Sequence, residues 1–197
     1  MRRKIVLSLV FATTVLGSNA VPAAVITPIG GSTSSFIGQG SIANVIDGII
    51  DYDSFLQLGE SGWGFGGPYS VMFDLGGSFD LTAMNLWNNA GNIEFDGEGI
   101  DAFALRFLDS GSVLLDTVNG NAIDTLAQQT FALSTSNVAF VELVINSNPG
   151  LLRKYVDFYE INFEGSPAVA VPEPTTSLLL MAGIATVFGV RKMQVEK

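Results

Sequence analysis

The chain has 197 residues with no Cys and no His, and its 9 Lys plus Arg face 19 Asp plus Glu, for a net charge of −10. Without Cys it has no disulfide, no catalytic thiolate and no thiolate metal site, and without His it lacks the commonest general base and transition-metal ligand. Between residues 25 and 171, where nearly all of the acids lie, the only cationic residues are Arg106, Arg153 and Lys154. We therefore expect no nucleic acid partner. The negative charge indicates either affinity for cations such as Ca²⁺ or simply solubility outside the cell.

The N-terminus has the three-part pattern of a secretory signal. A cationic start, Met1–Lys4, precedes 12 mostly apolar residues, Ile5–Leu16, and then a run of small residues. Such a run is too short to span a bilayer as a helix, which needs about 20 residues. We predict that residues 1–24 form a signal peptide, cleaved after Ala20 or Ala23. The alternative is an uncleaved N-terminal anchor.

An acidic segment with Asp47, Asp51 and Asp53 follows Ser41–Ile46, a stretch that suits a single helical turn. Three carboxylates and nearby backbone carbonyls offer the oxygen ligands that Ca²⁺ prefers. The spacing is not that of an EF-hand, because in a loop that begins with Asp51 the sixth position is Leu56 and not Gly. The alternative is a solvated acidic turn in which Asp47 accepts hydrogen bonds from backbone amides.

Aromatic residues alternate with glycines over residues 62–69, where Trp63, Phe65 and Tyr69 lie, and Trp87 follows later. Sugars bind on aromatic faces, and exposed loops commonly carry binding sites. We predict that these four residues form glycan-binding platforms. The alternative is that Trp63 and Trp87 are aromatic residues at the edge of the core.

Strands dominate the middle of the chain. Apolar and polar residues alternate over Tyr69–Leu75, Asp101–Asp109, Ala139–Asn146 and Tyr159–Phe163. A period of two with one apolar face indicates half-buried antiparallel strands. Turn residues separate them at Gly76-Gly77, Asn88–Gly91, Ser110-Gly111, Asn119-Gly120 and Asn146–Gly150. We predict an all-β, antiparallel β-sandwich or jelly roll over residues 25–165, with at most one further helical turn, at Ile123–Gln128.

A second acidic cluster, Asp96, Glu98 and Asp101, lies between two predicted strands. Its glycines and carboxylates suit either a solvated loop, which we expect, or a second cation site.

Four features of this region resemble the discoidin, or galactose-binding-like, jelly roll of coagulation-factor C-type domains. They are Asn44–Gly48, Trp63, the strand Val71–Gly76 ending Asp-Leu-Gly, and the closing strand Tyr159–Gly165. The chain departs from the family in the Gly-rich stretch Leu56–Gly67, where the spacing around Trp63 is loose. The resemblance implies a structural Ca²⁺ held by Asp47 and Glu160, with Asp51 or Asp53 as further ligands.

The C-terminus follows a small-residue linker at 166–171. Pro172-Glu173-Pro174 precedes an apolar stretch, Ser177–Val190, and the basic pair Arg191-Lys192. As a helix this stretch is about 21 Å long, short of the ~30 Å hydrocarbon core. Residues 172–197 resemble the PEP-CTERM sorting signal, which implies a transient inner-membrane helix, recognition and cleavage by an exosortase, and export in a Gram-negative bacterium that makes exopolysaccharide.

No catalytic constellation is evident, because serine nucleophiles lack a His and no Gly-x-Ser-x-Gly elbow occurs. We therefore expect a non-enzymatic structural or adhesive component of an extracellular polysaccharide matrix. One alternative is a carbohydrate-binding module with Ca²⁺-stabilised loops and a defined sugar site. A further alternative is a glycosidase that uses two carboxylates.

Overall fold

The computed structural model describes residues 23–51, 53–89, 98–149 and 153–168. These residues are mainly β-strands, with a short 3-10 helix, η1. The elements in chain order are β1 (Ala24–Ile26), β2 (Gly30–Ser32), β3 (Ile37–Gly40), η1 (Ile42–Val45), β4 (Leu56–Leu58), β5 (Tyr69–Asn88), β6 (Ala102–Leu108), β7 (Leu114–Asn121), β8 (Gln129–Ile145) and β9 (Val156–Pro167). The antiparallel all-β architecture predicted from the alternation is confirmed.

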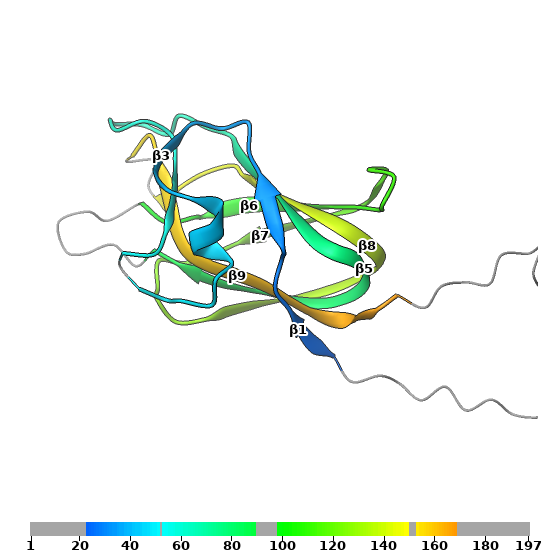
Figure 1. The fold of residues 1–197 in the computed structure, drawn as a ribbon. Coiled ribbons are helices and arrows are strands. Elements are labelled where there is room, and N and C mark those ends of the chain that lie inside the picture. The colour runs from blue at the N-terminus through cyan, green and yellow to red at the C-terminus, as the bar shows by residue number, and fades with distance from the viewer. Residues whose placement is uncertain (1–22, 52, 90–97, 150–152, 169–197) are drawn as a thin grey trace, which may run out of the picture.

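Two layers share the long strands β5 and β8, which curve together from one layer into the other (Figure 1). The first layer pairs β2 with the first half of β5, then the second half of β8, β6 and β7. The second layer pairs β3 with β4, then β9, the second half of β5 and the first half of β8. β1 lies along β9. Every pairing is antiparallel, as in a jelly roll.

The curve in β5 occurs where a turn was predicted. Gly76 has φ of 76° and its partner region in β8 has Asn137 at φ of 61°, a left-handed conformation that glycine and asparagine tolerate. The pairing register shifts between Asp74 and Phe79, and the Asn137 amide donates to Asp80 Oδ1 at 3.0 Å. The prediction of a chain reversal at Gly76-Gly77 was therefore wrong, because a bulge uses the same residues to redirect a continuous strand.

A single core fills the space between the layers. Alternate residues of the predicted strands are fully buried, among them Val71, Phe73, Leu105 and Leu143, and the rings of Phe73 and Phe163 meet edge to face at 6.5 Å. Burying a side chain of this size contributes about 1.5–3 kcal/mol relative to leaving it exposed. The period-two pattern therefore locates the core correctly.

The short-range predictions had mixed outcomes. The turn at Ser41–Ile46 is confirmed as η1, whereas Ile123–Gln128 contains no helix. Asn119-Gly120 does not reverse the chain but lies in β7, where a Cβ on Gly120 would lie 2.4 Å from the Phe103 ring. Among the described residues, no helix is long and apolar enough to cross a membrane. The predicted signal peptide up to residue 22 and the predicted sorting signal lie outside the described residues.

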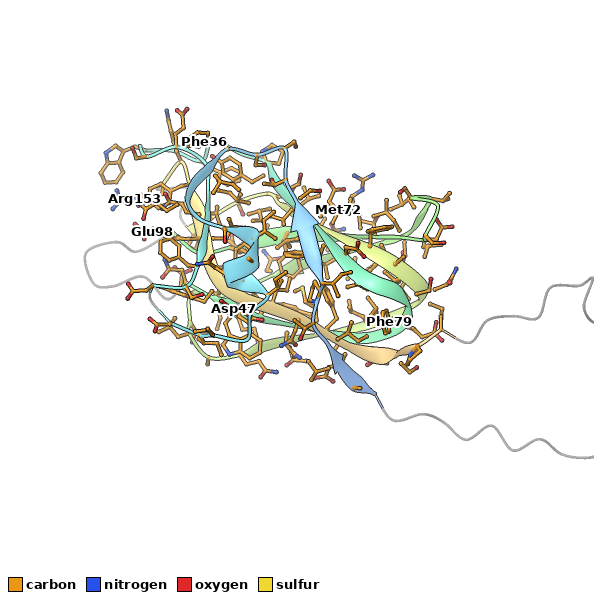
Figure 2. All side chains as sticks on the ribbon, in the orientation of Figure 1. Phe36, Asp47, Met72, Phe79, Glu98 and Arg153 are labelled. Atoms are coloured by element: carbon orange, nitrogen blue, oxygen red, sulfur yellow. The ribbon has the colours of Figure 1, made fainter. Side chains whose placement is uncertain are left out.

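The two ends of the described chain leave the sandwich together. Ala24 of β1 pairs with Gly165 near the end of β9. Figure 2 places Phe36, Glu98 and Arg153 at the left end of the molecule, whereas β1 and the end of β9 lie toward the lower right. The loops around Arg153 are therefore presented away from the points at which the chain enters and leaves the domain.

Candidate functional site at the loop end of the sandwich

The loop between β4 and β5 is tied to the segment that precedes β9. The Lys154 amide donates to the Gly62 carbonyl at 3.1 Å, and the Gly66 amide donates to the Lys154 carbonyl at 3.4 Å. The Tyr69 hydroxyl also donates to the Lys154 carbonyl. A Cβ on Gly59 or Gly66 would lie 2.4 or 2.5 Å from this hydroxyl, so glycine is needed at both positions. These contacts fix a glycine-rich loop whose tip carries Trp63.

Trp63 is the most exposed aromatic side chain of the described residues, at 73%. The Arg153 guanidinium lies over its ring, 4.6 Å from the ring centroid, within the range of a cation–π contact. Trp63 and Arg153 also form an isolated β-bridge. Because Arg153 covers one face of the indole, the large exposed fraction means that the other face is open to solvent.

Arg153 connects this platform to a carboxylate. Its Nε lies 3.7 Å from Glu98 Oε1, and the Tyr155 hydroxyl donates to the same oxygen at 2.6 Å. Burial, followed by the hydrogen bond to Glu98, raises the pKa of Tyr155, so this hydroxyl stays protonated as a donor. Glu98 itself is only 9% exposed and is held by its carbonyl, which accepts from the Asp157 amide at 2.8 Å.

Asp157 lies beneath this group in β9. Burial raises its pKa to about 7, and the neighbouring Glu98 charge acts in the same direction, whereas hydrogen bonds with Asn89 and Gln57 act against it. The end of the sandwich thus combines an open aromatic face, a guanidinium and hydrogen-bonded carboxylates. Hydroxyl-rich ligands use this combination, since they present apolar C–H faces and many hydrogen-bonding groups.

The other aromatic residues predicted for the platform occupy different places. Phe65 is half-buried and packs edge to face on Tyr69, with ring centroids 5.5 Å apart, and Tyr69 is 8% exposed. They support the Trp63 loop from below. Trp87 lies in the second layer, where it pairs with Glu160 of β9. Trp87 is therefore placed beside the acidic loop.

The acidic loop brings Asp47 and Glu160 together, as the resemblance implies. The Gly48 amide donates to Glu160 Oε2 at 3.2 Å, and the Ser54 hydroxyl donates to Asp47 Oδ2 at 3.1 Å. Burial raises the pKa of Glu160 to about 7, with a contribution from the negative charge of Asp47. The Asp51 carboxylate instead accepts from the Asp53 amide at 3.0 Å. In the described ranges, no three acidic side chains are grouped at a spacing that would hold a metal.

The second acidic cluster is divided. Asp101 accepts from the Ser147 hydroxyl at 3.0 Å, Glu98 belongs to the Arg153 group, and Asp96 lies outside the described residues. Sequence reasoning treated Glu98 as part of a solvated loop and Arg153 only as a charge. No local pattern reveals their contact, because 55 positions separate them in the chain.

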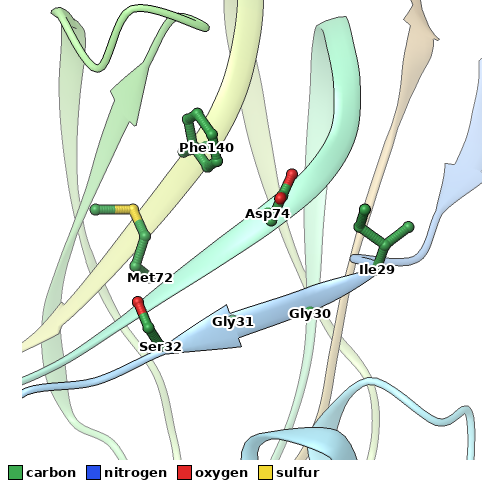
Figure 3. Close-up of a pocket in the computed structure, with 7 residues that line it drawn as sticks. All are labelled: Ile29, Gly30, Gly31, Ser32, Met72, Asp74 and Phe140. Carbon is green, nitrogen blue, oxygen red and sulfur yellow. The ribbon is translucent and has the colours of Figure 1, made fainter.

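A separate hollow of about 300 Å³ lies on the outer face of the first layer, beside β2 (Figure 3). Met72 and Phe140 form its apolar side and Asp74 its carboxylate, while a Cβ on Gly30 would meet nothing within 4 Å. Asp74 already accepts from the Gly76 amide at 2.8 Å.

Residues 170–192 match the family model of the PEP-CTERM protein-sorting motif, which confirms the predicted sorting signal. Comparison with curated proteins found no match.

The fold is similar to many solved structures. The family 32 carbohydrate-binding module of C. perfringens NanJ in complex with galactose has a TM-score of 0.58 and 16% identity, over 72% of this chain and 98% of that one. A family 32 module from Clostridium perfringens in complex with GalNAc-β-1,3-galactose has a TM-score of 0.57 and 17% identity, over 71% and 99%. A Streptococcus pneumoniae fucose-binding module has a TM-score of 0.55 and 14% identity, over 71% and 96%. The predicted galactose-binding-like jelly roll is thereby confirmed.

Proposed function

We propose that this protein is an exported, non-enzymatic glycan-binding module that attaches to polysaccharide at the cell surface or in the surrounding matrix. The observation that carries the proposal is the open face of Trp63, backed by Arg153, at the end of the sandwich. A sugar ring would stack on this face through its C–H bonds, while Arg153 would hold the indole from its other face.

The delivery route supports this role. The PEP-CTERM motif implies export and processing by an exosortase, and we propose a Gram-negative host that makes exopolysaccharide. The end of β9 lies away from the end of the molecule that carries Arg153 (Figures 1 and 2), and Arg153 lies over the Trp63 ring. A chain held by its C-terminal segment would therefore present Trp63 to the surroundings. The similar modules bound to galactose, GalNAc-β-1,3-galactose and fucose support a sugar as the ligand.

A non-enzymatic role suits the carboxylates at this end. A glycosidase needs two carboxyl groups that flank the bond to be cleaved. Glu98 and Asp157 are 9% and 7% exposed, and both are engaged by neighbouring side chains. The two carboxylates are therefore not free to lie on opposite sides of a glycosidic bond in a sugar stacked on Trp63.

We also propose a structural Ca²⁺ at Asp47 and Glu160. These residues fit the ion. Two neighbouring carboxylates, one of them buried, repel each other, and a bound cation would neutralise both negative charges. The Ser54 hydroxyl and the Asn44 carbonyl of η1, whose oxygens lie 3.2 Å apart, are further oxygens near this pair. The ion would link β9 to the loop that precedes β4.

A glycan array tests the proposed function. The wild-type protein should bind a defined set of neutral glycans, Trp63→Ala should lose that binding, and Val113→Ala should retain it. Val113 is a matched control, since it is also an exposed apolar residue, at 60%, but lies at the β6–β7 turn. Sugar release from matrix polysaccharide would instead support the glycosidase alternative.

A further inference from the structure

Phe36 lines two grooves that adjoin the Trp63 loop. This side chain is 61% exposed and immediately precedes β3. Its backbone is fixed, because the Gly59 amide donates to the Phe36 carbonyl at 2.8 Å. One groove, of about 270 Å³, runs from Phe36 over Glu60 and Tyr69 to Lys154. Figure 2 shows Phe36 at the same end of the molecule as Arg153.

The second groove, of about 440 Å³, is also lined by Phe36. Gln39, Gln57 and Ser61 line it, and it shares Phe36, Gly59 and Glu60 with the first groove. The two hollows therefore form one channel with an aromatic residue and a carboxylate at its middle. The first hollow is just below the usual size range of a small-molecule site, about 300–1,000 Å³, and the second lies within it.

The channel is continuous with the proposed sugar site. Ser61 precedes Trp63 by two residues, and Lys154 follows Arg153. The aliphatic part of Lys154 runs along Gly62, where a Cβ would meet its Cδ at 2.9 Å. Lys154 thus lies between the Trp63 platform and the groove beside Phe36, and a linear ligand that leaves the platform would enter that groove.

The chemistry of the channel fits an uncharged sugar chain. Phe36 offers an apolar face, Glu60 accepts hydrogen bonds, Lys154 donates them, and the amides of Gln39 and Gln57 do both. Of the 19 acids in the chain, nearly all lie in this domain, so a polyanionic chain would be repelled at long range. A neutral chain avoids this cost and uses both the donors and the acceptors.

We infer that the channel beside Phe36 binds the sugar units next to the one on Trp63, so that the protein recognises a neutral oligosaccharide segment rather than a single sugar. This inference rests on the proposed function. It predicts that affinity rises with chain length, and that Phe36 determines this rise while Trp63 determines whether any sugar binds.

The test uses isothermal titration with neutral homo-oligosaccharide ladders of galactose, glucose, mannose or N-acetylglucosamine, from monomer to hexamer. Wild type should bind the hexamer of the preferred sugar more tightly than the monomer. Phe36→Ala should weaken hexamer binding about tenfold, the upper range of an aromatic contact, and leave monomer binding unchanged. Glu60→Gln should also weaken the hexamer selectively, and Val113→Ala should change neither.

The outcomes separate the two proposals. Equal affinity for monomer and hexamer, or a Phe36→Ala variant with the full dependence on length, overturns the channel and leaves glycan binding standing. Absence of binding to every ladder overturns both. Melting temperatures of the variants check folding, and a fold defect is not expected because Phe36 and Glu60 are exposed.

Discussion

The guanidinium of Arg153 lies 4.6 Å from the centre of the Trp63 ring and 3.7 Å, through Nε, from the Glu98 carboxylate. One side chain thus holds an exposed aromatic ring and a buried acid in fixed positions. This contact joins the loop before β5 to the segment before β9, and the proposed sugar site depends on it.

Replacing Arg153 with Ala removes both contacts. We expect the free energy of unfolding to fall by about 1–3 kcal/mol, because Glu98 loses a buried charged partner and the cation–π contact is lost. Trp63 fluorescence should shift to longer wavelength as the ring becomes more hydrated. Arg153→Lys should fall between Ala and wild type, since it keeps the charge but not the planar group. Unchanged emission and stability in Arg153→Ala would show that the contact is not formed.

Stability should decrease as the pH rises from about 4 to above 7 in Ca²⁺-free buffer. Burial raises the pKa of Asp157 from 3.8 to about 7 and that of Glu160 from 4.5 to about 7. An acid whose pKa is higher in the folded protein binds more protons when folded. Its stabilising contribution is therefore complete below the unfolded pKa and is lost as the pH rises through the folded pKa.

Thermal melting across this pH range measures the effect. Asp157→Asn and Glu160→Gln should each flatten the dependence, whereas Asp116→Asn, on β7, should not. A melting temperature that rises steadily from pH 4 to 8 in chelator would contradict the burial of both acids.

Ca²⁺ should raise the melting temperature of the wild-type protein, and chelator should reverse the rise, because an ion that binds only the folded state stabilises it by mass action. Asp47→Asn and Glu160→Gln should abolish the response, with Asp116→Asn as the control. Asp51→Asn should retain most of it, because the Asp51 carboxylate is engaged by the Asp53 amide. No shift at millimolar Ca²⁺ would remove the proposed ion.

Alanine substitutions at Pro172, Glu173 and Pro174 should block processing. We expect the mature wild-type protein to lack residues 175–197 and the triple variant to keep them and remain in the inner-membrane fraction. Mass spectrometry of the protein from each fraction measures this. A mature wild-type protein that still carries residues 175–197 would contradict removal of the signal.

The sequence predicts features that arise from local patterns. Alternation over residues 69–75 and 139–146 places one face of β5 and of β8 in the core. Successive side chains of a strand point to opposite faces, so every second residue is buried. Gly76-Gly77 was misread because positive φ serves a bulge as well as a turn. The turn predicted at Gly120 was wrong, because glycine is used there to leave space for the Phe103 ring and not to reverse the chain.

The candidate site was predicted only in part, for a related reason. Trp63 stands out because glycines surround it. The contact of Glu98 with Arg153 depends instead on how strands from distant parts of the sequence are ordered in the sandwich. Phe36 is a single aromatic residue in a Ser- and Gly-rich stretch, and its role follows only from the two grooves that it lines.

The central claim is that a sugar lies on Trp63, and the two tryptophans of the chain allow a direct test by NMR. The indole N–H signals of Trp63 and Trp87 can be assigned with Trp63→Phe and followed while the preferred glycan is titrated. We predict that the Trp63 signal shifts in a saturable manner and that the Trp87 signal does not. A saturable shift of Trp87 alone, or of neither signal while the glycan binds, would contradict the account.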